Sequence, residues 1–249
     1  MIRAQVFQNA ACNWRCWYCF VPFALLNADE KYSTWRSAEE LLDLWEAEIN
    51  APLVIDLTGG QPDLTPEWIP WMMRGLTARG KTSSVYLWSD DNLSNDYFWR
   101  HLSEDDIRLV SGYRNYGKVC CFKGFNQASF AFNTKADPAL FERQFDLFAR
   151  YHKLGLDVYA YATFTCLEEK GIGDDMRRFV DRLQAVSGNM PLRVVPLEIQ
   201  SFSPVHGRIE SLHSRSMELQ WVAIQCWNDE LKKRFGESIR QQRICDIAI

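Results

Sequence analysis

The chain has 249 residues, of which 47% are apolar, enough to bury the core of one domain, and we expect a single domain over 1–249. Its net charge of -4 and the lack of a basic stripe argue against nucleic acid as a partner. No apolar run reaches bilayer length and the N-terminal residues hold no signal-peptide core, so we expect a cytoplasmic protein without a membrane partner.

Strand and helix patterns alternate along the chain. Short β-branched or aromatic runs predict strands at 3–9, 53–58, 84–89, 118–123, 157–164 and 193–199. Amphipathic patterns between them predict helices at 37–49, 66–79, 94–102, 138–153 and 173–186. Repeated strand-helix units favour an α/β fold with a parallel sheet. A last helical pattern over 209–240 is expected to cover an edge of that sheet. The core would then occupy about 1–205 and the C-terminal helical segment about 209–249.

Three cysteines follow the first predicted strand, with the spacing C-x3-C-x2-C: Cys12, Cys16 and Cys19. A 4Fe-4S cluster normally takes four thiolates, so a compact group of three predicts a cluster with one open iron. A zinc site needs four Cys or His ligands, and the nearest histidine, His101, is far along the chain. Disulfides need an oxidising compartment, which nothing in the sequence indicates. Chance clustering of buried, unliganded cysteines is the remaining alternative.

A glycine-rich turn follows the second predicted strand, in the run Gly59-Gly60-Gln61-Pro62. Without side chains in the way, a Gly-Gly turn can present backbone carbonyls to the amino group of a ligand. Taken alone, Gly-Gly-x-Pro is also a common turn. Its place one strand after the cysteines favours the functional interpretation.

Polar residues follow the third predicted strand: Asp90, Asp91 and Asn92. Carboxylates can accept hydrogen bonds from ribose hydroxyls. The alternative is a turn that feeds the next helix, with Ser94 as its N-cap. At the end of the fourth strand, Lys123 shares a face with Cys121 by period-two alternation. A buried lysine there would need an anionic partner, whereas a lysine at the rim would extend to solvent.

The cysteine run, with Tyr18 just before the third cysteine, resembles the cluster motif of the radical S-adenosylmethionine (SAM) enzymes. The Gly-Gly turn resembles their G-G-E-P-like element, with Gln61 in place of the usual acid. The resemblance implies a partial (β/α)6 TIM-like barrel and two cofactors. One is a 4Fe-4S cluster on Cys12, Cys16 and Cys19, and the other is SAM, which chelates the open iron.

The resemblance also implies which residues hold SAM. Lys123 would pair with its carboxylate, and Leu197 lies in the strand that flanks the adenine. The full group of residues expected to bind the cofactor is Tyr18, Gly59, Gly60, Gln61, Pro62, Asp90, Asp91, Asn92, Lys123 and Leu197.

The implied reaction is reductive cleavage of SAM to a 5'-deoxyadenosyl radical, which abstracts hydrogen from a small-molecule or peptide substrate. The electron would come from a low-potential donor such as a flavodoxin or ferredoxin. Catalytic residues are only weakly indicated. Cys121 and Cys166 could donate a hydrogen atom or could simply be buried packing. Glu198 could contact substrate or pair with a basic residue.

Two alternative functions stay open. One is an activating enzyme for a glycyl-radical enzyme, although Phe20-Val21-Pro22 departs from the polar residues usual after the third cysteine. The other is an iron-sulfur electron carrier or redox sensor without enzymatic activity. The remaining cysteines lack the spacing of a second cluster, so one cluster is expected. Most of the ten tryptophans are expected in the core, although Trp14, Trp17 and Trp88 could line a barrel mouth.

Overall fold

The computed structural model describes residues 3–249, so that residues 1 and 2 of the predicted domain lie outside the described part. It contains the six predicted strands: β1 (Gln5–Gln8), β2 (Val54–Thr58), β3 (Tyr86–Asp91), β4 (Tyr116–Phe122), β5 (Asp157–Thr163) and β6 (Val194–Leu197). They form one parallel sheet whose strand order follows the chain. The predicted α/β class with a parallel sheet is confirmed.

The five helices predicted between the strands are present: α1 (Ala38–Glu46), α2 (Trp68–Ala78), α3 (Tyr97–His101), α6 (Leu140–Lys153) and α7 (Ile172–Val186). Two further helices, α4 (Glu104–Gly112) and α5 (Gln127–Thr134), were not predicted. Helix α4 begins with a capping box in which the Ser103 hydroxyl and the Asp106 carboxylate each accept a backbone N–H. Short 3-10 turns complete the chain: η1 (Phe23–Leu26), η2 (Pro62–Leu64), η3 (Met190–Arg193) and η4 (Ile244–Asp246).

The C-terminal part differs from the single helix predicted over 209–240. A short α8 (Ser203–His206) precedes the long α9 (Ser211–Arg234), and the chain turns at Gly236 before α10 (Glu237–Arg240). Glycine ends helices readily because it loses the most backbone entropy on folding. The last residues are anchored: Ile247 is only 3% exposed, and the Arg193 guanidinium donates to its carbonyl at 2.6 and 2.8 Å. Within residues 3–249, no helix combines the length and apolarity needed to cross a membrane.

The chain divides into two compact units. Unit 1 comprises residues up to 13, 21–119 and 151–158, and unit 2 comprises 14–20, 120–150 and 159–249. The division falls inside the cysteine motif, because Cys12 belongs to unit 1 whereas Cys16 and Cys19 belong to unit 2. A single domain over 1–249 stays a prediction.

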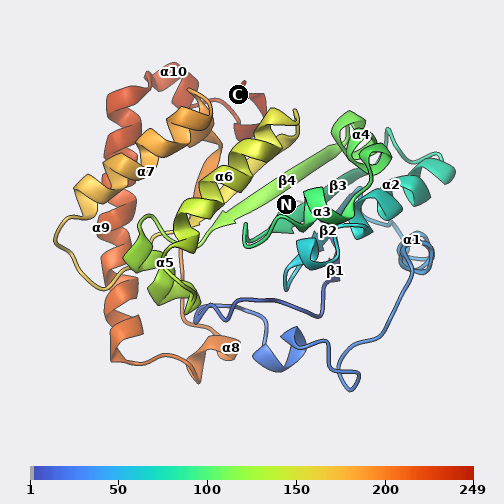
Figure 1. Ribbon diagram of the computed structural model, residues 1–249, viewed down its shortest axis with the longest axis horizontal. Coiled ribbons are helices and arrows are strands. Elements are labelled where there is room, and N and C mark those ends of the chain that lie inside the picture. Colours follow the sequence, from blue (N-terminus) through green and yellow to red (C-terminus); the bar gives the residue numbers. More distant parts are fainter. Residues whose placement is uncertain (1–2) are drawn as a thin grey trace. The chain divides into compact units, whose positions relative to one another are not determined.

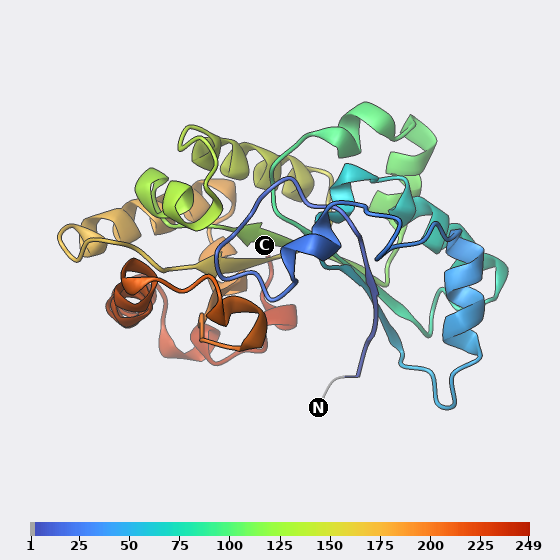
Figure 2. The ribbon, with the colours of Figure 1, turned by 90° about the horizontal axis from the view of Figure 1, so that it is seen from below.

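In unit 1, the two faces of the sheet differ in polarity. Ile55, Leu57, Leu87 and Ser89 are fully buried on one face of β2 and β3. The alternate residues on the other face are partly exposed: Asp56, Thr58, Trp88 and Asp90. Helices α1 and α2 lie side by side (Figure 2). A Cβ at Gly75 of α2 would overlap the Leu42 side chain of α1, so glycine permits this close packing. The sheet of this unit thus has one buried, mostly apolar face and one polar, partly exposed face.

The core of unit 2 is aromatic. Phe179 of α7 lies with its ring centroid 5.5 Å from that of Phe122 and 6.1 Å from that of Trp227 on α9. Helices α7 and α9 run side by side (Figure 1). The rings of Phe122 and Phe179 meet edge-on, whereas those of Phe179 and Trp227 are tilted. Such aromatic pairs add stabilisation beyond the apolar area they bury. Trp14 and Trp17 are 5% and 2% exposed, so both belong to this core.

Candidate functional site

The Gly-Gly turn of unit 1 has a backbone conformation that requires glycine. Gly59 and Gly60 have φ values of +66° and +64°. A Cβ at Gly60 would overlap the carbonyl oxygens of Asn9 and Ala11. Both the positive φ and the close approach of another backbone therefore exclude a side chain here.

Hydrogen bonds fasten this turn to the segment that leads to Cys12. The Gln61 N–H donates to the Ala11 carbonyl at 2.7 Å, and the Asn9 side-chain amide donates to the Gln61 carbonyl at 3.2 Å. Asn9 also accepts from the Ala11 N–H at 2.9 Å. Sequence reasoning missed Asn9, although asparagine directly after a strand is a common turn former.

The Gln61 side chain joins this turn to the end of β3. Its amide nitrogen donates to Asp91 Oδ1 at 2.7 Å, and its amide oxygen accepts from the Asn92 N–H at 2.8 Å. Gln61 and Asp91 are both fully buried. An amide can donate to one neighbour and accept from the other, whereas an ionised carboxylate only accepts.

A buried ionic network lies behind Asp91. Lys118 Nζ lies 2.8 and 3.0 Å from the two carboxylate oxygens of Asp63 and 3.9 Å from Asp91 Oδ2. The Tyr151 hydroxyl lies 2.7 Å from Asp63 and 2.8 Å from Asp91. Burial, with the Asp91 carboxylate beside it, raises the pKa of Asp63 to about 6 against the opposing effect of Lys118. The strand that carries Lys118 has the sequence YGKVCCF, and all seven of its residues are buried. A lysine in such an apolar run is a sequence signal that we missed.

On the polar face of β2 and β3, two carboxylates lie close together. The Thr58 hydroxyl donates to Asp90, and the Trp88 indole donates to the same carboxylate at 3.3 Å. Asp56 Oδ1 is buried and has no hydrogen-bond partner among the described residues. Burial and the nearby Asp90 raise the pKa of Asp56 to about 7. Asp56 was not predicted as a site residue.

The Asn92 side chain points toward the first cysteine. Its amide nitrogen donates to Asn13 Oδ1 at 3.1 Å and lies 3.8 Å from Cys12 Sγ. Its oxygen accepts from the Ser94 N–H at 3.1 Å, and the Ser94 hydroxyl donates to Asn13. Ser94 is therefore not the N-cap of α3, which begins at Tyr97 after this polar turn. The structure does bring Asn92 to the cysteine motif.

In unit 2, buried contacts hold the second half of the cysteine motif. The Trp17 indole donates to Asn133 Oδ1 at 3.0 Å, and the Thr163 hydroxyl donates to the Tyr18 hydroxyl at 2.9 Å. Tyr18 is 8% exposed, and burial raises the pKa of its hydroxyl well above the ordinary value. The Cys19 carbonyl accepts from Arg208 at 2.7 Å. Asn133 and Arg208 were not predicted, because both come from distant parts of the chain.

The other predicted residues of unit 2 lie at or near strand ends. Lys123 directly follows β4 and is half-buried, and its carbonyl accepts from Asn133 at 2.9 Å. Leu197 is the last residue of β6 and is also half-buried. The roles of Lys123 and Leu197 in holding the cofactor stay predictions.

The candidate catalytic residues differ in their surroundings. Cys121 and Cys166 are buried, and burial together with Asp175 raises the pKa of the Cys166 thiol to about 11. Glu198 is exposed, and no ion pair holds it within residues 3–249. Its role as a substrate contact or as the partner of a basic residue stays a prediction.

The cysteines themselves have the chemistry that a cluster needs. Within residues 3–249 no disulfide joins the cysteines, with Cys16 buried and Cys12 and Cys19 partly exposed. In the described part of the chain, no three His, Cys, Asp or Glu side chains are arranged to hold a metal ion. The assignment of Cys12, Cys16 and Cys19 as iron ligands stays a prediction that rests on their spacing.

No protein-family model and no curated protein matches the sequence. Solved structures do match. SuiB from Streptococcus suis, bound to S-adenosylmethionine, superposes with a TM-score of 0.60 at 13% identity over 94% of this chain and 48% of SuiB. SuiB bound to its precursor peptide SuiA gives 0.55 at 13% identity, over 93% of this chain and 46% of that one. A structure of anSMEcpe with bound AdoMet gives 0.54 at 13% identity, over 80% and 50% of the two chains.

SuiB and anSMEcpe are radical SAM enzymes. The chain has the radical SAM fold. Its parallel sheet is therefore the predicted partial barrel. The chain spans about half the length of the radical SAM structures that it matches.

Proposed function

We propose that this protein is a radical SAM enzyme that cleaves S-adenosylmethionine reductively and uses the resulting radical to abstract hydrogen from a substrate. The observation that carries the proposal is the motif C-x3-C-x2-C, whose three cysteines form no disulfide, in a chain with the radical SAM fold. When bound, the 4Fe-4S cluster and SAM supply the electron transfer and the radical chemistry.

The chain's own residues would hold the cluster and shield it. Cys12, Cys16 and Cys19 would be its ligands. The burial of Cys16 limits solvent access, and the Asn92 amide near Cys12 Sγ is a donor for a ligand sulfur. Water exclusion and donors to sulfur are the usual means by which proteins adjust such clusters.

The residues predicted to hold SAM divide into two roles. Gly59 and Gly60 would leave the backbone open to the ligand amino group, and Asp90 on the polar face would accept from ribose hydroxyls. Gln61 and Asp91 are fully buried and bonded to each other, so they would act by holding the turn in place.

In unit 2, Lys123 would pair with the SAM carboxylate, and Leu197 would pack on the adenine. Tyr18 is held by Thr163 and would give the cysteine motif a rigid support. Pro62 is buried at the start of η2 and stiffens the exit of the turn in unit 1.

The substrate class that we propose is a small molecule or a peptide. The peptide option draws on SuiB, which has been solved with its precursor peptide SuiA. The electron would come from a low-potential donor such as a flavodoxin or ferredoxin. A reducing cytoplasm would keep the cysteines as thiols that can bind iron.

The deciding experiment is anaerobic reconstitution with iron and sulfide, followed by dithionite reduction in the presence of SAM. We expect a cluster absorbance and formation of 5'-deoxyadenosine. Cys16→Ala should lose both, whereas Cys245→Ala, an exposed thiol outside the motif, should retain both. A reducible cluster that never cleaves SAM would instead show an electron carrier or redox sensor. Cleavage accompanied by formation of a glycyl radical on a partner enzyme would show an activating enzyme.

A further inference from the structure

Arg208, which lies 189 positions after Cys19 in the sequence, makes a direct contact with the cysteine motif. It lies in the turn between α8 and α9 and is half-buried. Its guanidinium Nη1 donates to the carbonyl oxygen of Cys19 at 2.7 Å. The backbone N–H of Arg208 donates to the Val205 carbonyl at 2.8 Å. The side chain and the backbone of this arginine are thus both bonded.

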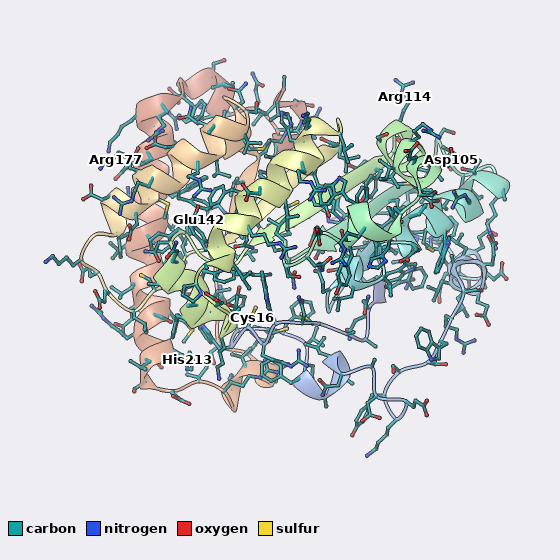
Figure 3. All side chains as sticks on the ribbon, in the orientation of Figure 1. Cys16, Asp105, Arg114, Glu142, Arg177 and His213 are labelled. Atoms are coloured by element: carbon teal, nitrogen blue, oxygen red, sulfur yellow. The ribbon has the colours of Figure 1, made fainter. Side chains whose placement is uncertain are left out.

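The start of α9 is fixed next to the same loop. His213 lies in the first turn of α9. Its ring centroid is 4.6 Å from that of Trp17, with the rings tilted, and it stacks on Phe132 at 5.5 Å. Figure 3 labels His213 and Cys16 at the end of the unit where α9 begins. The His213 Nδ1 accepts from the Glu210 N–H at 3.0 Å. These contacts hold the segment that carries Arg208 in one place.

The charge at this position has a physical consequence for a cluster on the loop. Arginine stays protonated at every physiological pH, and a half-buried charge is screened less than an exposed one. A reduced iron-sulfur cluster carries one more negative charge than the oxidised cluster. A fixed cation beside a ligand residue therefore stabilises the reduced form more, and the reduction potential rises.

We propose that Arg208 is a positioning residue that holds the Cys19 end of the cluster loop and raises the reduction potential of the cluster. The inference rests on the proposed function, because it requires a cluster on Cys12, Cys16 and Cys19. It assigns a role in electron uptake to the segment that joins the barrel to its C-terminal helix.

The test compares three anaerobically reconstituted variants with the wild type: Arg208→Gln, Arg208→Lys and Arg215→Gln. Arg215 is an exposed arginine of α9 paired with Glu218, and serves as the matched control. The readouts are iron content, the midpoint potential from a redox titration followed by electron paramagnetic resonance, and the rate of iron loss to a chelator.

We expect Arg208→Gln to shift the potential to more negative values and to release iron several-fold faster. Arg208→Lys should keep most of the potential, and Arg215→Gln should match the wild type. Loss of iron from Arg208→Gln alone, with retention by Arg208→Lys, also supports the proposal. A wild-type potential in Arg208→Gln, or an equal shift in the lysine variant, overturns it. A wild type that takes up no iron refutes the proposed function instead.

Discussion

The side-chain amide of Gln61 donates a hydrogen bond to the carboxylate of Asp91 over 2.7 Å, and both side chains are fully buried. This contact accounts for the amide at the position where the radical SAM motif usually has an acid. A glutamate would set two carboxylates against each other, while glutamine links the Gly-Gly turn to the end of β3. The glutamine at position 61 is thus complementary to its hydrogen-bond partner Asp91.

Gln61→Glu should therefore lower the free energy of unfolding at pH 8 by about 1–3 kcal/mol, because it replaces a buried hydrogen bond by a repulsive pair. The loss should shrink toward pH 5, where a protonated glutamic acid can again donate to Asp91. Urea denaturation at the two pH values measures both effects. Gln200→Glu, at an exposed position, is the control. Equal midpoints for Gln61→Glu and wild type at pH 8 would contradict this account.

Lys118→Met should cost about 3–5 kcal/mol of unfolding free energy, because Asp63 and Asp91 would lose their buried counter-charge. Adding Asp63→Asn should recover part of the loss, since one buried negative charge is removed. A double-mutant cycle by urea denaturation measures this coupling. Strictly additive losses would show that the two side chains do not act as an ion pair.

Gly60→Ala should weaken SAM binding and destabilise the fold by more than the roughly 1–2 kcal/mol that a positive φ alone costs a non-glycine residue. Gly80→Ala is the matched control, because Gly80 has a φ of +67° and no atom within 4 Å of the place that an alanine methyl group would take. Thermal unfolding and calorimetric SAM titration measure the two effects. The same loss in both variants would remove the close backbone approach from the explanation.

Asp56 should make stability depend on pH. Its pKa is raised from 3.8 to about 7, so the folded state retains a proton that the unfolded state releases between these values. The contribution of Asp56 to stability is therefore fully present below about pH 4 and is lost as the pH rises to 7. Asp56→Asn should stabilise the protein at pH 8 relative to wild type more than at pH 5. A pH-independent difference between the two unfolding curves would contradict the assigned shift.

Local patterns in the sequence sufficed for the strands and for most helices, because alternation and helical periodicity act over a few residues. The capping residues of α4, Ser103 and Asp106, were readable as well and were overlooked. The contacts between distant segments were not readable. Lys118 meets Asp63 across 55 positions, and Arg208 meets Cys19 across 189, so only the folded chain brings them together.

The candidate site was predictable to the extent that its residues act through backbone or through fixed spacing. The cysteine motif and the Gly-Gly turn were found in this way. Asp91 was predicted as a ligand of the cofactor, and the structure shows its oxygens bonded to Gln61, Leu93 and Tyr151. Whether a polar side chain faces a ligand or the protein interior depends on tertiary packing, which a motif does not specify.

The packing of Gly60 against the main chain of residues 9–11 bears on how such proteins diverge. Main-chain atoms are common to every amino acid, so a contact made from them constrains few of the neighbouring side chains. Most surrounding positions can then change during evolution while the architecture persists. A shared fold can then persist where sequences differ, in keeping with the TM-score of 0.60 and the 13% identity to SuiB.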